Sequence, residues 1–400
     1  MTDPILQAPL AGLRVVELGQ LIAGPFCGQL LGDFGAEVIK VEAPDRPDPA
    51  RDWGAVKHQG QGLLWPIIAR NKKSLTLNLR LEAGQAILKR LIGTADVLVE
   101  NFRPGTLEKW GLGPDVLQAL NPRLIVVRVS GYGQTGPESH EPGYASVGEA
   151  KAGLRHLIGE PDRPPARAGV SLGDTMTGTF AAFGAVMALY HREKSGRGQI
   201  VDAAIYESVM AFMESLIPEY QLEGHIRQRS GSILPKVAPS GAYPCDDGMV
   251  IIGANQDTLF ERLAHMMGQA WATDPRFATH DARGDHQAML DSLISEWTRR
   301  RTVRDVLTAC EAHAIPAGPV NTAEDLLADA HIKARQAIVR LVSPLMGTEV
   351  AMQAPVPKLS LTPGQVVATG PGFGVHTDVL LEELGYSAEQ RSRLRQEHVI

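Results

Sequence analysis

The first 130 residues alternate between short apolar runs that are typical of buried strands and segments that are typical of helices, and this alternation constrains the fold more than any other feature. An apolar run at residues 13–18 leads through a glycine-rich turn to a helix that begins at Pro25 and ends at Gly35. A second apolar run follows at residues 37–42. This order predicts a βαβ unit.

The same pattern recurs twice. A helical segment at residues 82–92 precedes an apolar run at residues 97–100, and another at residues 114–120 precedes an apolar run at residues 124–129. Repeated alternation of this kind predicts a largely parallel sheet covered by helices, whose ligands bind beyond the carboxyl ends of the strands. We therefore expect a binding site in the loops that follow Leu18, Glu100 and Val129.

The middle of the chain predicts two further helices and then a linker. Residues 179–191, which are followed by a helix stop at Gly196, and residues 206–216 are apolar on every face, as in helices buried within a protein or against a partner. Gly, Ser, Pro and basic residues replace the periodic pattern at residues 223–240. We interpret this change as the domain boundary.

Beyond the linker, apolar runs on both sides of Asp246-Asp247-Gly248 predict a β-hairpin, and residues 259–312 predict two amphipathic helices. We therefore predict an α/β fold in three parts. A large domain with a parallel sheet takes residues 1–222, a linker and a smaller α+β domain take residues 223–320, and residues 321–400 return to the large domain.

Charge and cysteine usage exclude several classes of partner. The formal net charge is −6, and Lys and Arg form no dense cluster, so nucleic acid is not expected as a partner. We identify no segment that is apolar over enough residues to span a bilayer, so no membrane partner is expected either. Cys27, Cys245 and Cys310 lie far apart, which indicates neither a disulfide framework nor a zinc site and favours a reducing, cytoplasmic compartment.

Gly173-Asp174-Thr175 places one carboxylate at the start of a long apolar helix. An acid at this position is most often only an N-cap for free backbone N–H groups. In the alternative interpretation, the helix dipole keeps Asp174 ionised as a nucleophile, and Gly173 leaves room for an acyl carbon. Both interpretations can hold together.

Basic residues recur near the ends of the predicted strands. Any one of them is most simply a solvated surface residue, but together they favour an anionic ligand with several phosphates, such as coenzyme A. The residues are Arg70, Lys72 and Lys73, which we place in one loop, and Arg80, Arg103 and Lys109. A nicotinamide dehydrogenase is disfavoured, because the turn after Leu18 lacks the G-x-G-x-x-G pattern.

Six motifs, in this order along the chain, resemble those of the class III CoA-transferases. They are Ala23-Gly24-Pro25, the run from Gly35 to Glu42, Asn71-Lys72-Lys73-Ser74, the run from Glu100 to Gly105, the run from Gly131 to Pro137, and Gly173-Asp174. The resemblance implies a Rossmann-like large domain and a smaller domain in an interlocked homodimer.

The resemblance also implies the site residues. Asp174 is then the catalytic aspartate, no cofactor is tightly bound, no metal is required, and a coenzyme A thioester is a substrate. The coenzyme A surface implied in this way comprises Ile22, Ala23, Leu77, Asn78, Arg80, Asn101, Phe102, Arg103, Lys109 and Tyr132. In such an enzyme the aspartate accepts the acyl group from sulfur as an anhydride and then carries coenzyme A as a thioester.

Two alternatives remain open at this point. The related 2-methylacyl-CoA racemases pair the aspartate with a histidine, but Gly143-Tyr144-Ala145 stands in the segment where that histidine falls. A non-catalytic acyl-CoA-binding protein would need only the nucleotide surface.

Within the family, residues 231–239 resemble the branch that moves coenzyme A from succinyl-CoA to other dicarboxylates. An additional acceptor carboxylate would need a cation, which Arg227, Arg229 or Lys236 could supply.

Overall fold

The computed structural model describes residues 8–400, and the chain divides into two compact units. The large unit comprises the chain up to residue 154 together with residues 168–215 and 331–400. The small unit comprises residues 155–167 and 216–330. Each unit has its own core of buried apolar side chains.

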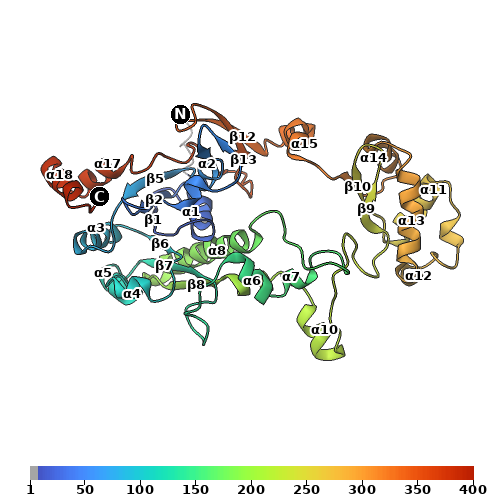
Figure 1. Cartoon of the computed structure of the whole chain (residues 1–400), viewed down its shortest axis with the longest axis horizontal. Helices are drawn as coiled ribbons and strands as arrows, with labels where there is room; N and C mark the ends of the chain where they lie inside the picture. The colour runs from blue at the N-terminus through green and yellow to red at the C-terminus, as the bar shows by residue number, and fades with distance from the viewer. Residues whose placement is uncertain (1–7) are drawn as a thin grey trace. The chain divides into compact units, whose positions relative to one another are not determined.

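The large unit is built on a six-stranded parallel sheet (Figure 1). Its strands are β1 (Arg14–Glu17), β2 (Glu37–Glu42), β5 (Lys72–Thr76), β6 (Val97–Glu100), β7 (Ile125–Ser130) and β8 (Ile200–Ala204). The spatial order β5-β2-β1-β6-β7-β8 is 3-2-1-4-5-6 in chain order, which is that of doubly wound dinucleotide-binding folds. The predicted parallel sheet is therefore confirmed, and its strand order reverses between β1 and β6.

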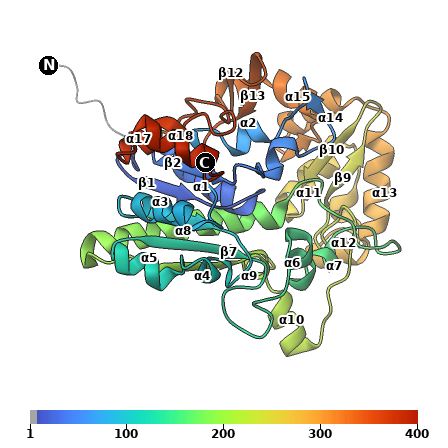
Figure 2. The same cartoon turned by 60° about the vertical axis from the view of Figure 1, so that its left-hand side comes forward.

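Helices cover both faces of this sheet (Figures 1 and 2). One face packs against α1 (Ala23–Asp33) and α8 (Leu172–Ser195) in a core of Ala, Val and Leu side chains. The other face packs against α3, α5 and the C-terminal helices α17 and α18. These span Glu82–Ile92, Pro114–Leu120, Thr377–Glu383 and Ala388–Gln396.

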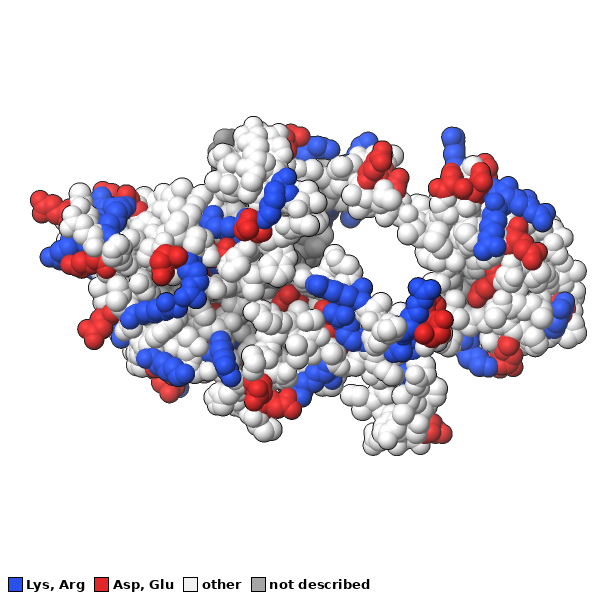
Figure 3. Space-filling view, viewed as in Figure 1, with Lys and Arg blue, Asp and Glu red and all other residues white. Residues whose placement is uncertain are grey.

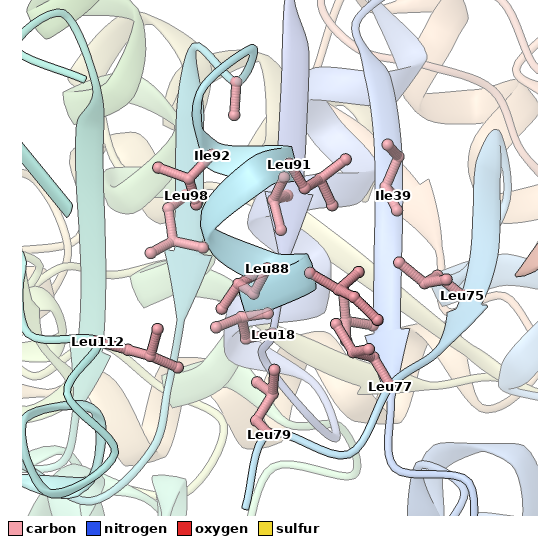
Figure 4. Packing of buried hydrophobic residues seen from close by; sticks show 14 of the residues in the cluster. Leu18, Ile39, Leu75, Leu77, Leu79, Leu88, Leu91, Ile92, Leu98 and Leu112 are labelled. Carbon is pink, nitrogen blue, oxygen red and sulfur yellow. The ribbon is translucent and has the colours of Figure 1, made fainter. Parts of the chain in front are cut away.

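Helix α3 buries apolar side chains against this second face of the sheet. Leu88, Leu91 and Ile92 recur at helical spacing on one side of α3 and point toward the sheet, where they meet Leu18 and Leu98 (Figure 4). All five side chains are fully buried. Burial of each stabilises the fold by about 1.5–3 kcal/mol.

Helix α8 begins at Leu172, next to the start that Gly173-Asp174-Thr175 indicated, and ends where Gly196 takes a left-handed conformation with φ 71°. By length and composition alone it could cross a membrane, which we did not expect from the sequence. Its alanines, among them Ala181, Ala185 and Ala188, are buried against the sheet and α1. A helix in the core of a protein can have the same length and composition as a membrane-spanning helix. The length and composition of α8 are therefore weak evidence for a membrane span.

The C-terminal segment covers one edge of the sheet. The main-chain N–H of His376 donates to the carbonyl oxygen of Ser74 at 3.1 Å, and the Thr377 hydroxyl accepts from the N–H of Thr76 at 3.0 Å. These bonds satisfy groups that the edge strand β5 would otherwise expose. A hairpin of β12 (Ile338–Ser343) and β13 (Thr348–Gln353) precedes this contact.

The small unit contains the antiparallel sheet β11-β10-β9, formed by Ala317–Pro319, Met249–Gly253 and Ser240–Pro244. The predicted hairpin is confirmed, since β9 pairs with β10. The prediction of two helices in residues 259–312 is wrong, because four α-helices form between residues 257 and 312: α11 (Asp257–Met266), α12 (His280–Asp285), α13 (Gln287–Thr298) and α14 (Val303–Ala312).

The single helix predicted at residues 206–216 is also wrong. The chain forms α9 (Ile205–Met210) and α10 (Leu216–Glu223), and Glu214 between them has a left-handed φ of 49°, which a continuous helix excludes. The remaining short elements are η1 (Pro49–Asp52), β3 (Lys57–His58), β4 (Gln61–Gly62), α2 (Trp65–Ile68), α4 (Thr106–Lys109), α6 (Ala145–Lys151), α7 (Leu154–Leu157), η2 (Trp271–Thr273), α15 (Ala323–Ala328) and α16 (Ala330–Ala334).

Candidate active site

A pocket of about 250 Å³ opens at the carboxyl ends of four adjacent strands of the large unit. Its lining residues belong to the ends of β1, β2, β5 and β6 or to the loops that follow them. They are Leu18, Gln20, Val41, Glu42, Ala43, Asp45, Arg46, Leu77, Asn78, Leu79, Arg80, Phe102, Thr106 and Trp110. The pocket therefore lies where a doubly wound sheet binds its ligands, beside the point where the strand order reverses.

The pocket combines an aromatic pair with free cations. Phe102 and Trp110 meet edge to face with ring centroids 5.4 Å apart, which offers an apolar surface to a flat ring. Arg46 and Arg80 are exposed and form no salt bridge within residues 8–400. Guanidinium groups without a carboxylate partner are suited to binding phosphates.

A buried ion pair holds the aromatic side of this pocket. Glu100 lies at the end of β6, where its carboxylate accepts from the Phe102 N–H at 2.8 Å and from Nε of Arg128 at 2.7 Å. Burial raises the pKa of Glu100, while Arg128 opposes that rise. The pair fixes the start of the loop that carries Phe102.

The turn after β1 is glycine-rich because a side chain from the neighbouring loop fills it. Oδ1 of Asn101 accepts from the Gln20 N–H at 2.7 Å, and its Nδ2 donates to the Gln20 carbonyl at 2.8 Å. A Cβ atom at Gly19 or Gly24 would lie 3.2 Å or 3.3 Å from atoms of the Asn101 side chain. The side chain of Asn101 therefore occupies the space beside Gly19 and Gly24.

Asp174 lies inside the first turn of α8, not ahead of the helix, since Ser171 is the N-cap residue. Asp174 is half-buried, and its side chain is not without an interaction partner. The preceding N–H, of Gly173, donates to Oε1 of Glu149 in α6 at 3.0 Å. Glu149 is 3 % exposed, so a buried acid satisfies an N–H group at the start of α8.

Helix α8 is also locked against α1. A Cβ atom at Gly178, four residues after Asp174 and on the same side of the helix, would lie 2.7 Å from the carbonyl oxygen of Ala23. The start of α1 is therefore in close contact with the second turn of α8. The turn that holds Gln20 leads directly into this part of α1, which packs one helical turn from the candidate nucleophile.

The comparisons with known proteins agree with this geometry. The family model described as CoA-transferase family III matches residues 10–377. The chain belongs to CoA-transferase family III. It is 54 % identical over 395 residues to succinyl-CoA–D-citramalate CoA-transferase of Chloroflexus aurantiacus, a match that covers 98 % of each chain.

Two further relatives of this CoA-transferase support the assignment. The beta subunit of succinyl-CoA–L-malate CoA-transferase from the same organism is 44 % identical over 402 residues, with 98 % of each chain covered. The crystal structure of a CAIB/BAIF family protein from Brucella suis is 34 % identical with a TM-score of 0.85, and the match covers 94 % of this chain and all of that one.

The residues expected to bind coenzyme A fall into two groups in the CoA-transferase. Leu77, Asn78, Arg80 and Phe102 line the pocket. The others lie outside its lining: Ile22 and Ala23 are buried at the start of α1, Asn101 clamps the turn, Arg103 donates to the His140 carbonyl, Lys109 is exposed at the end of α4, and Tyr132 is half-buried after β7. Their contact with coenzyme A stays a prediction.

Three of the basic residues singled out in the sequence are not at the binding edge. Arg70 and Lys72 are buried and paired with Asp33 and Glu17, and Lys73 is paired with Glu37. The prediction failed because residues 72–76 form strand β5, so these charges lie at the opposite end from the pocket or inside the sheet.

Sequence reasoning missed Arg46, Trp110 and Glu149. Arg46 and Trp110 line the pocket, and Glu149 binds the N-terminus of α8. Each is a single residue without a motif around it, so only the fold could identify it. Within residues 8–400 no cluster of His, Cys, Asp and Glu is placed to hold a metal ion, and the three cysteines are free.

Proposed function

We propose that this CoA-transferase moves coenzyme A from succinyl-CoA to a dicarboxylate, with citramalate and malate as the first acceptors to test. The observation that carries the proposal is the 54 % identity, over nearly the whole of both chains, to an enzyme named for succinyl-CoA and D-citramalate. The malate relative supports a four- or five-carbon hydroxydicarboxylate as the acceptor class.

Asp174 is the nucleophile in this proposal. Its carboxylate attacks the thioester carbonyl, the C–S bond breaks, and coenzyme A leaves as a thiolate while a mixed anhydride forms. The thiolate then attacks the aspartyl carbonyl, which releases the donor acid and leaves an aspartyl-CoA thioester. The thioester's free energy is retained throughout, so no other energy source is needed.

The second half of the reaction reverses these steps with the new acid. The acceptor carboxylate attacks the aspartyl-CoA thioester, which releases the thiolate and forms a second anhydride. The thiolate attacks the acceptor's acyl carbon, and Asp174 leaves as a free carboxylate. The position of Asp174 in the first turn of α8 supports these roles, because the helix dipole favours the ionised carboxylate to which the cycle returns.

Coenzyme A occupies the pocket of the large unit in this proposal. The pair Phe102 and Trp110 would take the adenine ring, and Arg46 and Arg80 would take phosphates. The contact between α1 and α8 then lets the pantetheine reach past the Gln20 turn toward Asp174.

A homodimer completes the proposal. Five apolar side chains lie exposed along one face of α8, at a spacing that places them in a stripe: Phe180, Phe183, Val186, Met187 and Tyr190. Phe212, which follows α9, extends the stripe, since its ring lies 5.7 Å from that of Phe180. An apolar stripe on a core helix is typical of a surface covered by another copy of the chain.

The salt bridges of the three candidate cations favour one of them for binding the acceptor. Arg227 is paired with Glu219 and Lys236 with Asp285, whereas Arg229 forms no salt bridge within residues 8–400 and is held by the carbonyls of Glu160 and His156. Arg229 is therefore our first choice for the acceptor's distal carboxylate.

The decisive experiment is to incubate the purified protein with succinyl-CoA and a panel of mono- and dicarboxylic acids and to detect new thioesters by mass spectrometry. We expect citramalyl-CoA or malyl-CoA, together with free succinate. Hydrolysis without a new thioester, or transfer only to monocarboxylic acids, would contradict the proposal.

The racemase alternative has less support. Gly143-Tyr144-Ala145 stands in the segment where the racemase histidine is expected, and Tyr144 is exposed before α6. Incubation of a 2-methylacyl-CoA in deuterated water tests it, because wash-in of deuterium at the α-carbon would favour a racemase.

A further inference from the structure

Behind the turn at residues 19–22 lies a cluster of four buried charged side chains that the proposed mechanism does not use. Glu17, Lys40, Asp48 and Lys72 are each at most 4 % exposed. Nζ of Lys40 lies 2.6 Å from Oδ2 of Asp48, and Nζ of Lys72 lies 2.7 Å from Oε2 of Glu17. A third contact of 3.5 Å joins Lys40 to Glu17, so the cluster holds two positive and two negative charges.

Two members of this cluster bind the main chain of the turn. The ammonium group of Lys40 donates to the carbonyl oxygen of Gly19. Oδ1 of Asp48 accepts from the N–H of Leu21 at 3.0 Å. Because Asn101 binds Gln20 from the other side, three consecutive residues of the turn are held by side chains from three other segments.

The conformation of the turn explains why it needs these contacts. Leu21 has a φ of 63°, in the left-handed region that residues with a Cβ atom rarely adopt. Such a conformation persists only where surrounding contacts enforce it, and it is concentrated at functional sites. The bond from the Leu21 N–H to Asp48 is such a contact.

The turn is linked to the helix of the nucleophile through the packing of α1 against α8. It leads directly into the first turn of α1, where Ala23 lies against Gly178 of α8, one helical turn from Asp174. A change in the turn therefore displaces the start of α1, which packs against α8 one helical turn from Asp174. Buried ion pairs add little net stability compared with apolar residues, so their presence here calls for another role.

We propose that Lys40 and Asp48 are positioning residues for acyl transfer, which hold the turn at residues 19–22 in the conformation that presents it to Asp174. This inference rests on the proposed function, because it assigns these residues to the same site. It does not make them catalytic residues, since both act through the main chain of Gly19 and Leu21.

Two double variants separate positioning from stability. Lys40→Met with Asp48→Asn removes both charges but keeps an oxygen that can accept from the Leu21 N–H, and Lys40→Met with Asp48→Ala removes that acceptor as well. Both leave the pair of Glu17 and Lys72 intact, so neither leaves a buried charge without a partner.

The matched control is an equally buried ion pair of the large unit that has no contact with the turn. Arg70→Met with Asp33→Asn removes such a pair. Thermal unfolding of all three variants and of the unchanged protein gives the loss of stability, and kcat is measured per folded molecule. The Kd for coenzyme A is measured by calorimetry.

We expect the Asp48→Ala double variant to have a kcat at least about tenfold below that of the Asp48→Asn double variant, because a misplaced backbone near the reacting atoms lowers the rate by up to about a hundredfold. The Kd for coenzyme A should change less than about threefold, because among the residues that line the pocket Gln20 alone belongs to the turn at residues 19–22. The control variant should lose stability without this loss of kcat.

Equal kcat values for the two double variants, or a loss that only follows the melting temperature as in the control, would overturn the inference. If the Asp48→Ala variant does not fold, the Asp48→Asn variant is compared with the control instead. It has lost the bond from Lys40 to Gly19, so its kcat should be lower than that of the control, and equal values would refute positioning. Failure of the proposed function is distinct, since the unchanged protein would then transfer no coenzyme A in the same assay.

Discussion

The amide of Gly173 and the carboxylate of Glu149 are joined by a 3.0 Å hydrogen bond, beside which an additional carbon atom at position 173 would be crowded. A Cβ atom at position 173 would lie 3.1 Å from Cγ of Glu149 and 3.3 Å from the Ala145 carbonyl. The close approach of α6 to the start of α8 therefore favours a glycine before the candidate nucleophile.

Gly173→Ala should displace the first turn of α8 and with it Asp174. We expect a loss of about 1–3 kcal/mol in the free energy of unfolding and a kcat about tenfold lower, since overpacking a tight contact forces the backbone to shift. Gly169→Ala is the control, because nothing lies within 4 Å of a Cβ atom there. Steady-state kinetics and urea unfolding check both, and equal kinetics for the two variants would be contrary to this expectation.

Asp174→Asn should abolish exchange while coenzyme A still binds. The amide is isosteric but cannot attack a thioester, so kcat should fall by about 10³-fold or more, whereas the Kd for coenzyme A should stay within about twofold. Asp162→Asn, at an exposed position of the small unit, is the control. Retained exchange in the Asp174 variant would exclude a covalent role for this residue.

Arg46→Ala and Arg80→Ala should each raise the KM for the acyl-CoA about tenfold with little change in kcat, because a charge-assisted contact to a phosphate is lost. The melting temperature should not change, since neither residue forms a salt bridge within the described chain. The effect should weaken as salt is added. Arg304→Ala, exposed on α14, should leave KM unchanged; similar KM values for all three variants would place coenzyme A elsewhere.

Phe183→Asp should impair assembly of the proposed dimer, because its side chain is 58 % exposed at the centre of the apolar stripe on α8. Light scattering at micromolar concentration should give twice the chain mass for the unchanged protein and a larger fraction near 43.1 kDa for the variant. Val116→Asp, on α5, should assemble normally. A monomeric mass for the unchanged protein would argue against the dimer.

His376 should make stability depend on pH. Its Nδ1 accepts from the Ser74 N–H at 3.0 Å, so the ring is neutral in this arrangement, and burial, with a further effect of the nearby Lys73 charge, lowers its pKa. The folded state then binds fewer protons than the unfolded state below the unfolded pKa of about 6.5. The stabilisation of the folded state by neutral His376 is fully present above the pKa of the unfolded state. It is lost as the pH falls through the lower pKa of the folded state.

Urea unfolding between pH 7.5 and pH 5 checks the direction of this change. His376→Asn should flatten the pH dependence, because the amide oxygen can accept from Ser74 and does not titrate. His331→Asn, at an exposed position, should keep the dependence of the unchanged protein. A slope that His376→Asn does not alter would assign the pH dependence to other groups.

Some elements followed directly from local patterns. Strand 37–42 and helices 82–92 and 114–120 form with the predicted bounds. In these segments the hydrophobic periodicity and the positions of Gly and Pro indicate the same ends. Strand β8 was missed, since Ile200–Ala204 is short, half exposed and runs into α9 without a turn residue. Its place in the sheet comes from pairing with β7, which no local pattern encodes.

The sequence by itself determined the alternation of strands and helices, the candidate nucleophile Asp174 and the resemblance to the family, because these depend on residue type and on spacing along the chain. Only the tertiary structure decided that Asn101 fills the Gln20 turn, that Lys72 is a buried partner of Glu17, and that Glu149 binds the start of α8. These are contacts between segments that lie 24 to 81 residues apart. Such contacts are set by strand order and helix packing. The residues that flank a charged or polar residue in the sequence do not indicate them.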